Sequence, residues 1–185
     1  TNKYLKSKAN QKNTTFVYEL SKLFKVDDIQ FINACNKFKG LSHRQEIFLK
    51  KRNITFINDS KATSFESCKQ ALYSSKNIYW IFGGLPKVGD KFNFQGISSN
   101  IIKSFIIGNK TNYFKNQVKK KIKYKISFNL NNAIEDIFKE LSLIKNNKAT
   151  VLFSPASASY DQFNNFVDRG NQFKKTIRAY AKKFF

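Results

Sequence analysis

Five short apolar segments lie along the chain after its first fifty residues, and β-branched and aromatic residues dominate them. They are residues 53–58, 78–82, 104–107, 124–128 and 149–153. Their apolar residues run nearly continuously, which is typical of strands buried on both faces of a sheet. The pattern therefore predicts five strands of a mostly parallel sheet.

Apolar residues at helical spacing appear between and after these segments. One such stripe follows Asn131 and Asn132 as far as Ile144, and another runs from Phe163 to Phe184. Strands that alternate with helices favour an α/β domain, in which helices flank a mostly parallel, doubly wound, Rossmann-like sheet.

The first forty residues follow a different pattern. Two helical segments, residues 14–24 and 28–37, succeed each other with no strand between them, and residues 38–40 break the second helix. We interpret residues 1–39 as the C-terminal helical tail of a preceding domain and residues 40–185 as the α/β domain. Because the chain opens with Thr1 inside a polar stretch, we expect it to be a fragment.

Charge adds an alternative to this picture. The chain has 34 basic and 12 acidic residues, a formal net charge of +22, and such an excess suggests nucleic acid, an anionic membrane or acidic small molecules as partners. The basic residues are nearly all Lys and are scattered, while Asn, Ile, Phe and Tyr are also abundant. Codons rich in A and T explain this profile better, and a basic α/β nucleic-acid-binding domain remains the alternative.

The cysteines and the single histidine argue against a metal site. Cys35 and Cys68 lack the spacing of a zinc or redox pair, and His43 alone does not complete one. Two unpaired cysteines fit a reducing compartment, and no apolar run approaches the ~20 residues of a membrane span. We expect a cytoplasmic protein that contacts no membrane.

The loop after the first predicted strand combines several groups that suit an anion. Ligands of open α/β sheets bind where such loops lead into helices. Asp59 and Lys61 lie in this loop, and Thr63 followed by Glu66 predicts a capping box at the start of a helix. Free N–H groups and the helix dipole favour negative charge there. Ordinary capping explains Thr63 and Glu66 equally well, but it leaves Asp59 and Lys61 unexplained.

Residues 83–90, which follow the second predicted strand, form a Gly- and Pro-containing turn that carries Lys87. The turn differs from a phosphate-binding loop because Asp90 stands where that motif has Lys. A plain turn is the simpler interpretation of this segment taken alone.

Residues 154–162 follow the last predicted strand, and small side chains there let a ligand approach the backbone. Ser159 with Gln162 predicts a second capping box. Two capped helix starts and Lys87 at one sheet edge therefore predict a pocket for a dicarboxylate.

Three weaker candidate residues lie before the predicted sheet. Arg44 follows the break between the two parts, and its guanidinium can bind a phosphate through two hydrogen bonds, although a surface Arg is the simpler interpretation. Asn10 and Asn13 lie one helical turn apart and can face one ligand.

Four stretches, in this order, resemble the Mur ligase family, and within it the members that add D-glutamate. They are FKGLSHRQE at 38–46, NDSKATS at 58–64, GGLPK at 83–87 and SPASASYDQFNNFVDRGNQF at 154–173. The resemblance covers essentially the whole chain, and residues 1–39 resemble the end of the family's ATP-binding central domain.

The resemblance implies an ATP-dependent ligase of peptidoglycan synthesis, which uses Mg²⁺ and joins D-glutamate to UDP-N-acetylmuramoyl-L-alanine through an acyl phosphate. By position, the residues that it places at the nucleotide are Asn10, Asn13, Arg44 and Asp59. Those that it places at D-glutamate are Lys61, Thr63, Lys87, Ser159, Tyr160 and Phe166, of which the last two would contribute mainly backbone N–H groups and shape.

The chain also departs from the family's pattern. The phosphate-binding loop and the magnesium ligands do not occur in these residues, and Ala9 stands where the family often has His, which weakens the assignment of Asn10. We therefore expect no catalytic residue in this chain, and no ligase activity from it alone. We also expect a monomer without a specific nucleic-acid partner.

Overall fold

The computed structural model describes residues 2–5, 8–144 and 147–185. The chain forms two compact units, Thr1–Leu41 and Ser42–Phe185, so the boundary lies two residues after the predicted one. No helix among the described residues is both long and apolar enough to cross a membrane.

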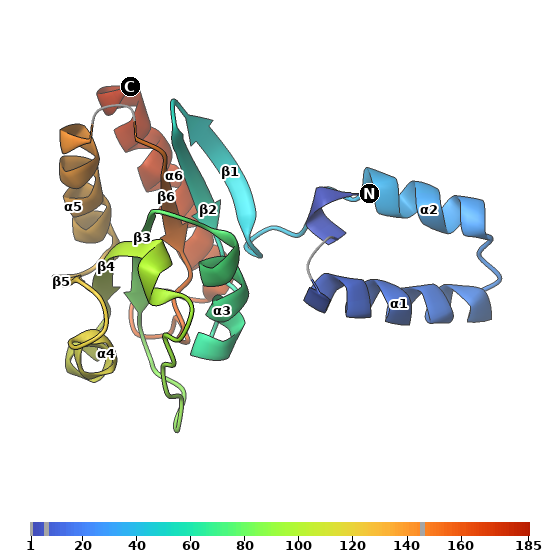
Figure 1. The fold of residues 1–185 in the computed structure, drawn as a ribbon, viewed down its shortest axis with the longest axis horizontal. Helices are drawn as coiled ribbons and strands as arrows, with labels where there is room; N and C mark the ends of the chain where they lie inside the picture. The colour runs from blue at the N-terminus through green and yellow to red at the C-terminus, as the bar shows by residue number, and fades with distance from the viewer. Residues whose placement is uncertain (1, 6–7, 145–146) are drawn as a thin grey trace. The chain divides into compact units, whose positions relative to one another are not determined.

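The first unit is a pair of helices preceded by one short turn of 3₁₀ helix (Figure 1). Its elements are η1 (Lys3–Leu5), α1 (Lys8–Leu23) and α2 (Asp28–Lys37). Asp27 starts α2, because its carboxylate accepts a hydrogen bond from the Gln30 backbone N–H at 2.8 Å. Both predicted helices are present, and α1 begins six residues earlier than predicted (Lys8, not residue 14).

The second unit is a six-stranded sheet with helices on both faces. Its strands are β1 (Glu46–Lys51), β2 (Ile54–Asn58), β3 (Ile78–Gly83), β4 (Ile101–Ile107), β5 (Tyr124–Phe128) and β6 (Ala149–Phe153). Its helices are α3 (Phe65–Ser74), η2 (Ser98–Asn100), α4 (Thr111–Val118), α5 (Leu130–Leu143) and α6 (Phe166–Phe184). The strand order is β1-β2-β6-β3-β4-β5, and only β1 runs antiparallel to its neighbour. The predicted α/β fold with a mostly parallel sheet is confirmed.

Strand β1 is the one strand of this sheet that the apolar pattern did not predict. It lies at the edge of the sheet, it carries charged residues, and none of its residues is fully buried. It pairs with β2 through a tight turn in which Arg52 adopts a left-handed conformation, with φ of 50°. A half-exposed edge strand lacks the continuous apolar run by which buried strands are found.

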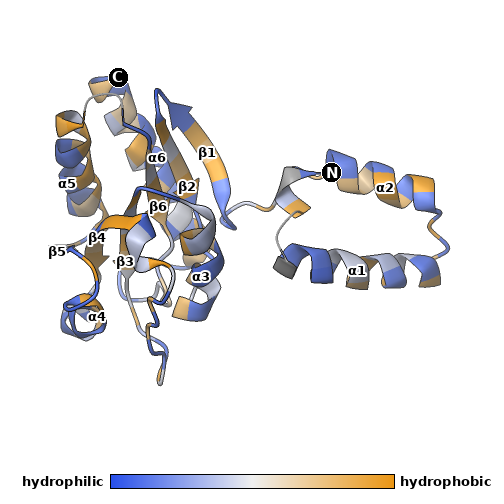
Figure 2. Cartoon of the chain, in the orientation of Figure 1, coloured by the Kyte–Doolittle hydropathy of each residue, from blue (hydrophilic) through white to orange (hydrophobic). Residues whose placement is uncertain are grey.

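Two separate cores hold the layers together. Helices α5 and α6 pack on one face of the sheet, and α3, α4 and the segment 92–97 pack on the other. Aromatic residues dominate the second core, in which Trp80 stacks on Phe82 with ring centroids 4.1 Å apart and Phe65 stacks on Phe92 at 4.2 Å. Hydrophobic residues fill the central strands, whereas α5 shows both hydrophobic and hydrophilic residues, as an amphipathic helix should (Figure 2).

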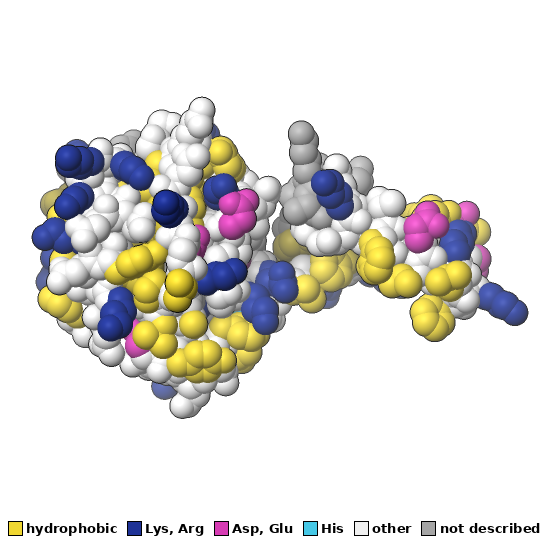
Figure 3. Space-filling view, turned by 90° about the horizontal axis from the view of Figure 1, so that it is seen from below, with side chains coloured by type: hydrophobic (Ala, Val, Ile, Leu, Met, Phe, Trp, Pro, Cys, Tyr) yellow, Lys and Arg dark blue, Asp and Glu magenta, His cyan; other side chains and the backbone are white. Residues whose placement is uncertain are grey.

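Charged side chains are spread over the surface of the second unit. On the face seen in Figure 3, Lys and Arg side chains occur in several places, with polar and apolar surface between these places. On that face, the excess positive charge is distributed and does not form a single basic patch.

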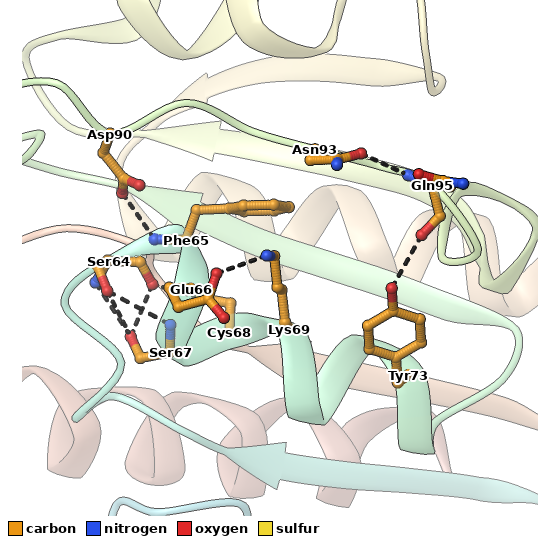
Figure 4. A network of polar contacts seen from close by, with 10 residues as sticks. All are labelled: Ser64, Phe65, Glu66, Ser67, Cys68, Lys69, Tyr73, Asp90, Asn93 and Gln95. Carbon is orange, nitrogen blue, oxygen red and sulfur yellow. Dashed lines mark hydrogen bonds and ion pairs between the residues drawn. The ribbon is translucent and has the colours of Figure 1, made fainter.

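The start of α3 differs from its prediction. Ser64, and not Thr63, is the N-cap: its hydroxyl accepts from the Ser67 N–H, and the Ser67 hydroxyl accepts in turn from the Ser64 N–H (Figure 4). Glu66 instead forms an ion pair with Lys69 at 2.5 Å. The capping box predicted for Thr63 and Glu66 is therefore wrong by one residue, because Ser64 can cap the same helix equally well.

The predicted cap at Ser159 is also wrong. The Ser159 carbonyl accepts hydrogen bonds from the N–H groups of Gln162 and Phe163, which closes a turn. Helix α6 begins only at Phe166, where the Asn165 side chain accepts from two backbone N–H groups at 2.9 Å. A side chain that satisfies two helix-start donors defines a stronger start than the Ser159 turn.

Candidate functional site

Three loops gather at the carboxyl edge of the sheet, where the parallel strands β2, β6 and β3 lie side by side. We call them the β2 loop (59–64), the β3 loop (84–90) and the β6 loop (154–165). In open α/β sheets this edge is where ligands bind. Six of the residues predicted to bind a ligand lie in these loops, and Phe166 follows the β6 loop directly.

Backbone hydrogen bonds join the three loops. The Asp59 N–H donates to the Phe153 carbonyl at 2.7 Å, which ties the β2 loop to the end of β6. Leu85 and Ala158 exchange two hydrogen bonds, at 3.1 and 2.9 Å, which tie the β3 loop to the β6 loop. The bases of the loops therefore hold fixed positions relative to one another.

Asp59 is buried, and both of its carboxylate oxygens already have partners within the protein. One oxygen accepts from the Gln45 N–H at 3.0 Å, and the other accepts from the Ser154 hydroxyl at 2.6 Å. Burial raises the pKa of Asp59 to about 6, and the nearby charge of Arg44 acts in the opposite direction. In this structure Asp59 anchors the β2 loop to its surroundings.

Lys61 and Phe166, both predicted at D-glutamate, lie together. The Lys61 ammonium nitrogen is 3.9 Å from the centroid of the Phe166 ring, a cation–π contact. The ring also meets the edge of His43, at 6.0 Å between centroids, and the Lys61 N–H donates to the His43 carbonyl at 3.0 Å. Both the backbone and the side chain of Lys61 are thus held in place.

A buried polar network lies beneath this pair. His43 Nδ1 is 2.9 Å from the Asn58 amide nitrogen, which also donates to Glu46 at 3.1 Å, and Lys174 pairs with Glu46 at 3.0 Å. Burial, followed by the charge of Lys174, lowers the pKa of His43, which favours the neutral ring that can accept a hydrogen bond from the Asn58 amide. Gly170 leaves room for the ring, since a Cβ there would lie 2.2 Å from His43 Nδ1.

Arg169 is a residue of the site that the sequence did not reveal. Its side chain is 1% exposed and lies between the β2 and β6 loops. Its Nε donates to the Ser60 hydroxyl at 3.1 Å, and its Nη2 donates to the carbonyls of Ser60 and Ser157 at 2.8 and 3.1 Å. Burial lowers its pKa to about 10, so it stays charged at neutral pH. The available signal was its position within the apolar stripe of α6, between Phe166 and Phe173.

The remaining candidates of these loops differ in exposure. Lys87 and Thr63 are exposed, Tyr160 is 72% exposed, and Ser159 is buried at 3%. The Asp90 N–H donates to the Lys87 carbonyl at 3.1 Å and closes the turn that presents Lys87. The loop connections place this exposed lysine on the same sheet edge as Lys61.

The four candidates for the nucleotide fall in different units. Asn10 and Asn13 belong to α1 of the first unit, where the Asn10 amide donates to the Tyr4 carbonyl at 2.7 Å and Asn13 is exposed. Arg44 belongs to the second unit and is exposed. Among the described residues, no group of three or more His, Cys, Asp and Glu side chains is arranged to hold a metal ion.

Comparison with known proteins identifies relatives along most of the chain. No family model matches it. It is 40% identical over 95% of its length to the UDP-N-acetylmuramoylalanine–D-glutamate ligase of Wolbachia sp. subsp. Brugia malayi, and 31% identical over 98% of its length to that of Rickettsia felis. The chain spans 35% and 40% of the length of these two relatives.

Solved structures of other proteins have the same fold as this chain. MurF from Acinetobacter baumannii superposes with a TM-score of 0.71 at 12% identity, over 94% of this chain and 38% of that one. A folylpolyglutamate synthase from Thermotoga maritima superposes with a TM-score of 0.54 at 14% identity, over 94% of this chain and 39% of that one. These structures share the fold, and the curated relatives share the sequence. The chain therefore belongs to the Mur ligase family and matches the C-terminal part of its UDP-N-acetylmuramoylalanine–D-glutamate ligases.

Proposed function

We propose that this chain supplies the D-glutamate-binding part of a cytoplasmic, ATP-dependent ligase that extends UDP-N-acetylmuramoyl-L-alanine during peptidoglycan synthesis. The observation that carries the proposal is the 40% identity to a relative named for this reaction. The loops at the sheet edge support it, because they bring Lys61 and Lys87 to one end of a parallel sheet.

The chemistry of the proposed reaction explains why two cations are useful. ATP transfers its γ-phosphoryl group to the alanine carboxylate, and ADP leaves. The amine of D-glutamate then attacks the acyl phosphate, the C–N bond forms, the C–O bond to phosphate breaks, and the amine gives up a proton. D-Glutamate must therefore be held by its two carboxylates while its amine stays free.

In this proposal the chain's residues bind and orient D-glutamate. Lys61 provides a fixed positive charge and Lys87 a mobile one, while Thr63 and Ser159 provide hydroxyl groups. Tyr160 and Phe166 provide backbone N–H groups and the wall of the pocket. Together these residues direct the two carboxylates and leave the amine unengaged.

The nucleotide side of the proposal rests on fewer contacts. Arg44 is exposed and suits a phosphate, and Asp59 would lie nearby, with Asn13 and, more weakly, Asn10 as further contacts. The described residues do not gather a ligand set for Mg²⁺, so no step through that ion is assigned to this chain. Because the family's phosphate-binding loop does not occur in this sequence, we expect the chain alone not to turn over ATP.

The alternative, a basic nucleic-acid-binding domain, is not favoured. Most phenylalanines of the second unit pack in the two cores, whereas single-stranded nucleic acid binds to exposed aromatic rings among basic residues. The distribution of Lys and Arg side chains over the face seen in Figure 3 agrees with this conclusion.

An NMR titration tests the proposal on the chain itself. The ¹⁵N-labelled chain is titrated with D-glutamate and, as the matched control, with L-glutamate at the same ionic strength. We expect D-glutamate to shift the backbone amides of the β2, β3 and β6 loops at lower concentration than L-glutamate does. An equal response to the two enantiomers, or no response in these loops, would contradict the proposal.

A further inference from the structure

Arg169 connects, directly or through one serine, all three loops of the sheet edge. Its guanidinium donates to the Ser60 carbonyl and hydroxyl in the β2 loop and to the Ser157 carbonyl in the β6 loop. The Ser157 hydroxyl in turn donates at 2.6 Å to the carbonyl of Gly83, the last residue of β3, which directly precedes the β3 loop. One buried group thus lies at the point where the three loops meet.

The same group reaches the Lys61–Phe166 pair. The Ser60 hydroxyl, which accepts from Arg169 Nε, donates to the Phe166 carbonyl at 2.8 Å. Lys61 is the next residue after Ser60, and its ammonium lies over the Phe166 ring. A substitution of Arg169 therefore changes the contacts of Ser60 that hold both Lys61 and Phe166 in place.

The geometry requires the planar fork of arginine. Nε and Nη2 point to two different groups of Ser60, while Nη2 also bridges to Ser157. A lysine has a single nitrogen on a flexible stem and cannot reproduce these directions together. The three acceptor atoms belong to Ser60 and Ser157, which are fully buried, so a lost donor leaves a buried acceptor without a partner, at a cost in stability.

A contribution to the stability of the fold does not by itself explain why an arginine is buried at position 169. Its Nη1 is the one buried side-chain nitrogen or oxygen without a hydrogen-bond partner among the described residues. An unsatisfied buried N–H on a charged group lowers stability, and buried charges contribute less than their contacts suggest. What the guanidinium does provide is a fixed spacing between the loops.

We infer that Arg169 is a positioning residue, which sets the relative placement of the three loops that present the D-glutamate-binding side chains. The inference rests on the proposed function, because it names what organises that same site. Arg169 acts through Ser60 and Ser157, and it is itself too buried to touch a ligand.

Three variants of the whole 185-residue chain test this role. Arg169→Lys keeps the charge and removes the fork. Ser60→Ala, a milder change, removes one acceptor of Arg169 and the link to Phe166. Arg178→Lys is the matched control, because Arg178 lies on the same helix but is exposed and contacts the Phe48 ring.

The first measurement is amide hydrogen exchange without ligand. The N–H groups of Leu85 and Ala158, which join two of the loops, are compared with core amides of β3 in each variant. We expect Arg169→Lys to speed exchange of the loop amides about tenfold relative to the core amides, and Ser60→Ala to do so less. Loop and core amides that change by the same factor would overturn the inference, since they would report only a global loss of stability.

The second measurement is the Kd for D-glutamate, taken well below each variant's Tm so that every sample is folded. We expect Arg169→Lys to raise the Kd about tenfold, because misplaced groups bind poorly, and Arg178→Lys to leave it unchanged. A Kd within twofold of the parent chain for both Arg169→Lys and Ser60→Ala would overturn the inference. If the parent chain itself does not bind D-glutamate, the proposed function fails, and the exchange measurement alone decides the role of Arg169.

Discussion

Lys61 and Lys87 carry the same charge to one sheet edge, but their surroundings differ. Lys61 is partly buried, its N–H is bound to the His43 carbonyl, and its ammonium lies over Phe166. Lys87 is exposed next to Val88, which is 99% exposed. The first lysine is already ordered before a ligand arrives, whereas the second must be ordered by it, at an entropic cost.

The β3 loop itself combines a fixed base with a free tip. Gly83 has φ of 125°, and a Cβ there would lie 2.0 Å from the Ile107 carbonyl oxygen. Gly89 has φ of 77° and no atom within 4 Å of such a Cβ. The exposed Lys87 therefore lies near the open tip of the turn, and close packing is confined to the attachment of the turn to the sheet.

The largest expected effect comes from the base of the β3 loop. Gly83→Ala should lower the free energy of unfolding by about 3 kcal/mol, from a backbone clash together with left-handed strain. Gly89→Ala should cost about 1 kcal/mol, from the strain alone. Urea unfolding of both variants measures the difference, and equal losses would show that the base is as free as the tip.

The next effect concerns Asp59, which anchors the β2 loop. Burial raises its pKa from 3.8 to about 6, so its contribution to stability is present below the unfolded pKa and is lost as the pH rises through about 6. The loss amounts to roughly 3 kcal/mol, at 1.36 kcal/mol per pKa unit. The unfolding free energy of the parent chain, taken relative to Asp59→Asn, should fall by that amount between pH 3.5 and pH 7.

Glu66→Gln serves as the control for this series, because the Glu66 side chain is 78% exposed. Its unfolding free energy gives the pH dependence of a chain that has lost an exposed carboxylate. If the unfolding free energies of the parent chain and of Asp59→Asn change in the same way between pH 3.5 and pH 7, burial does not raise the pKa of Asp59.

A smaller effect is expected where the β2 loop enters α3. Ser64→Ala should destabilise the chain by about 1 kcal/mol, because it removes the N-cap of α3. Thr63→Ala should cost less than about 0.5 kcal/mol, since Thr63 is exposed and does not cap the helix. Thermal unfolding of the two variants distinguishes the two positions, and a larger loss at Thr63 would restore the original interpretation.

Much of the fold follows from apolar periodicity. The five parallel strands were predicted because buried strands need continuous apolar runs, and β1 was missed because an edge strand with charged residues does not. The two misplaced caps have a different cause. Ser, Thr and Asn cap helices almost equally well, so only the folded chain shows that Ser64 and Asn165 hold the helix starts.

The site was predictable only in part, because its organisation depends on contacts between distant residues. The loops could be placed at one edge once the strands were known to be parallel. The bond between Arg169 and Ser60 joins residues 109 positions apart, and no local pattern indicates such a pair. The signal that remained was a charged residue within the apolar stripe of α6.

The most direct test of the account is whether the exposed lysine takes part in D-glutamate binding. Calorimetric titration of D-glutamate into the parent chain, Lys87→Ala and Lys91→Ala compares two exposed lysines that lie close together in the sequence. We predict that Lys87→Ala raises the Kd roughly fivefold, as expected for a solvent-exposed charge contact, while Lys91→Ala leaves it unchanged. The same Kd for the parent chain and Lys87→Ala would contradict the assignment of D-glutamate to this edge of the sheet.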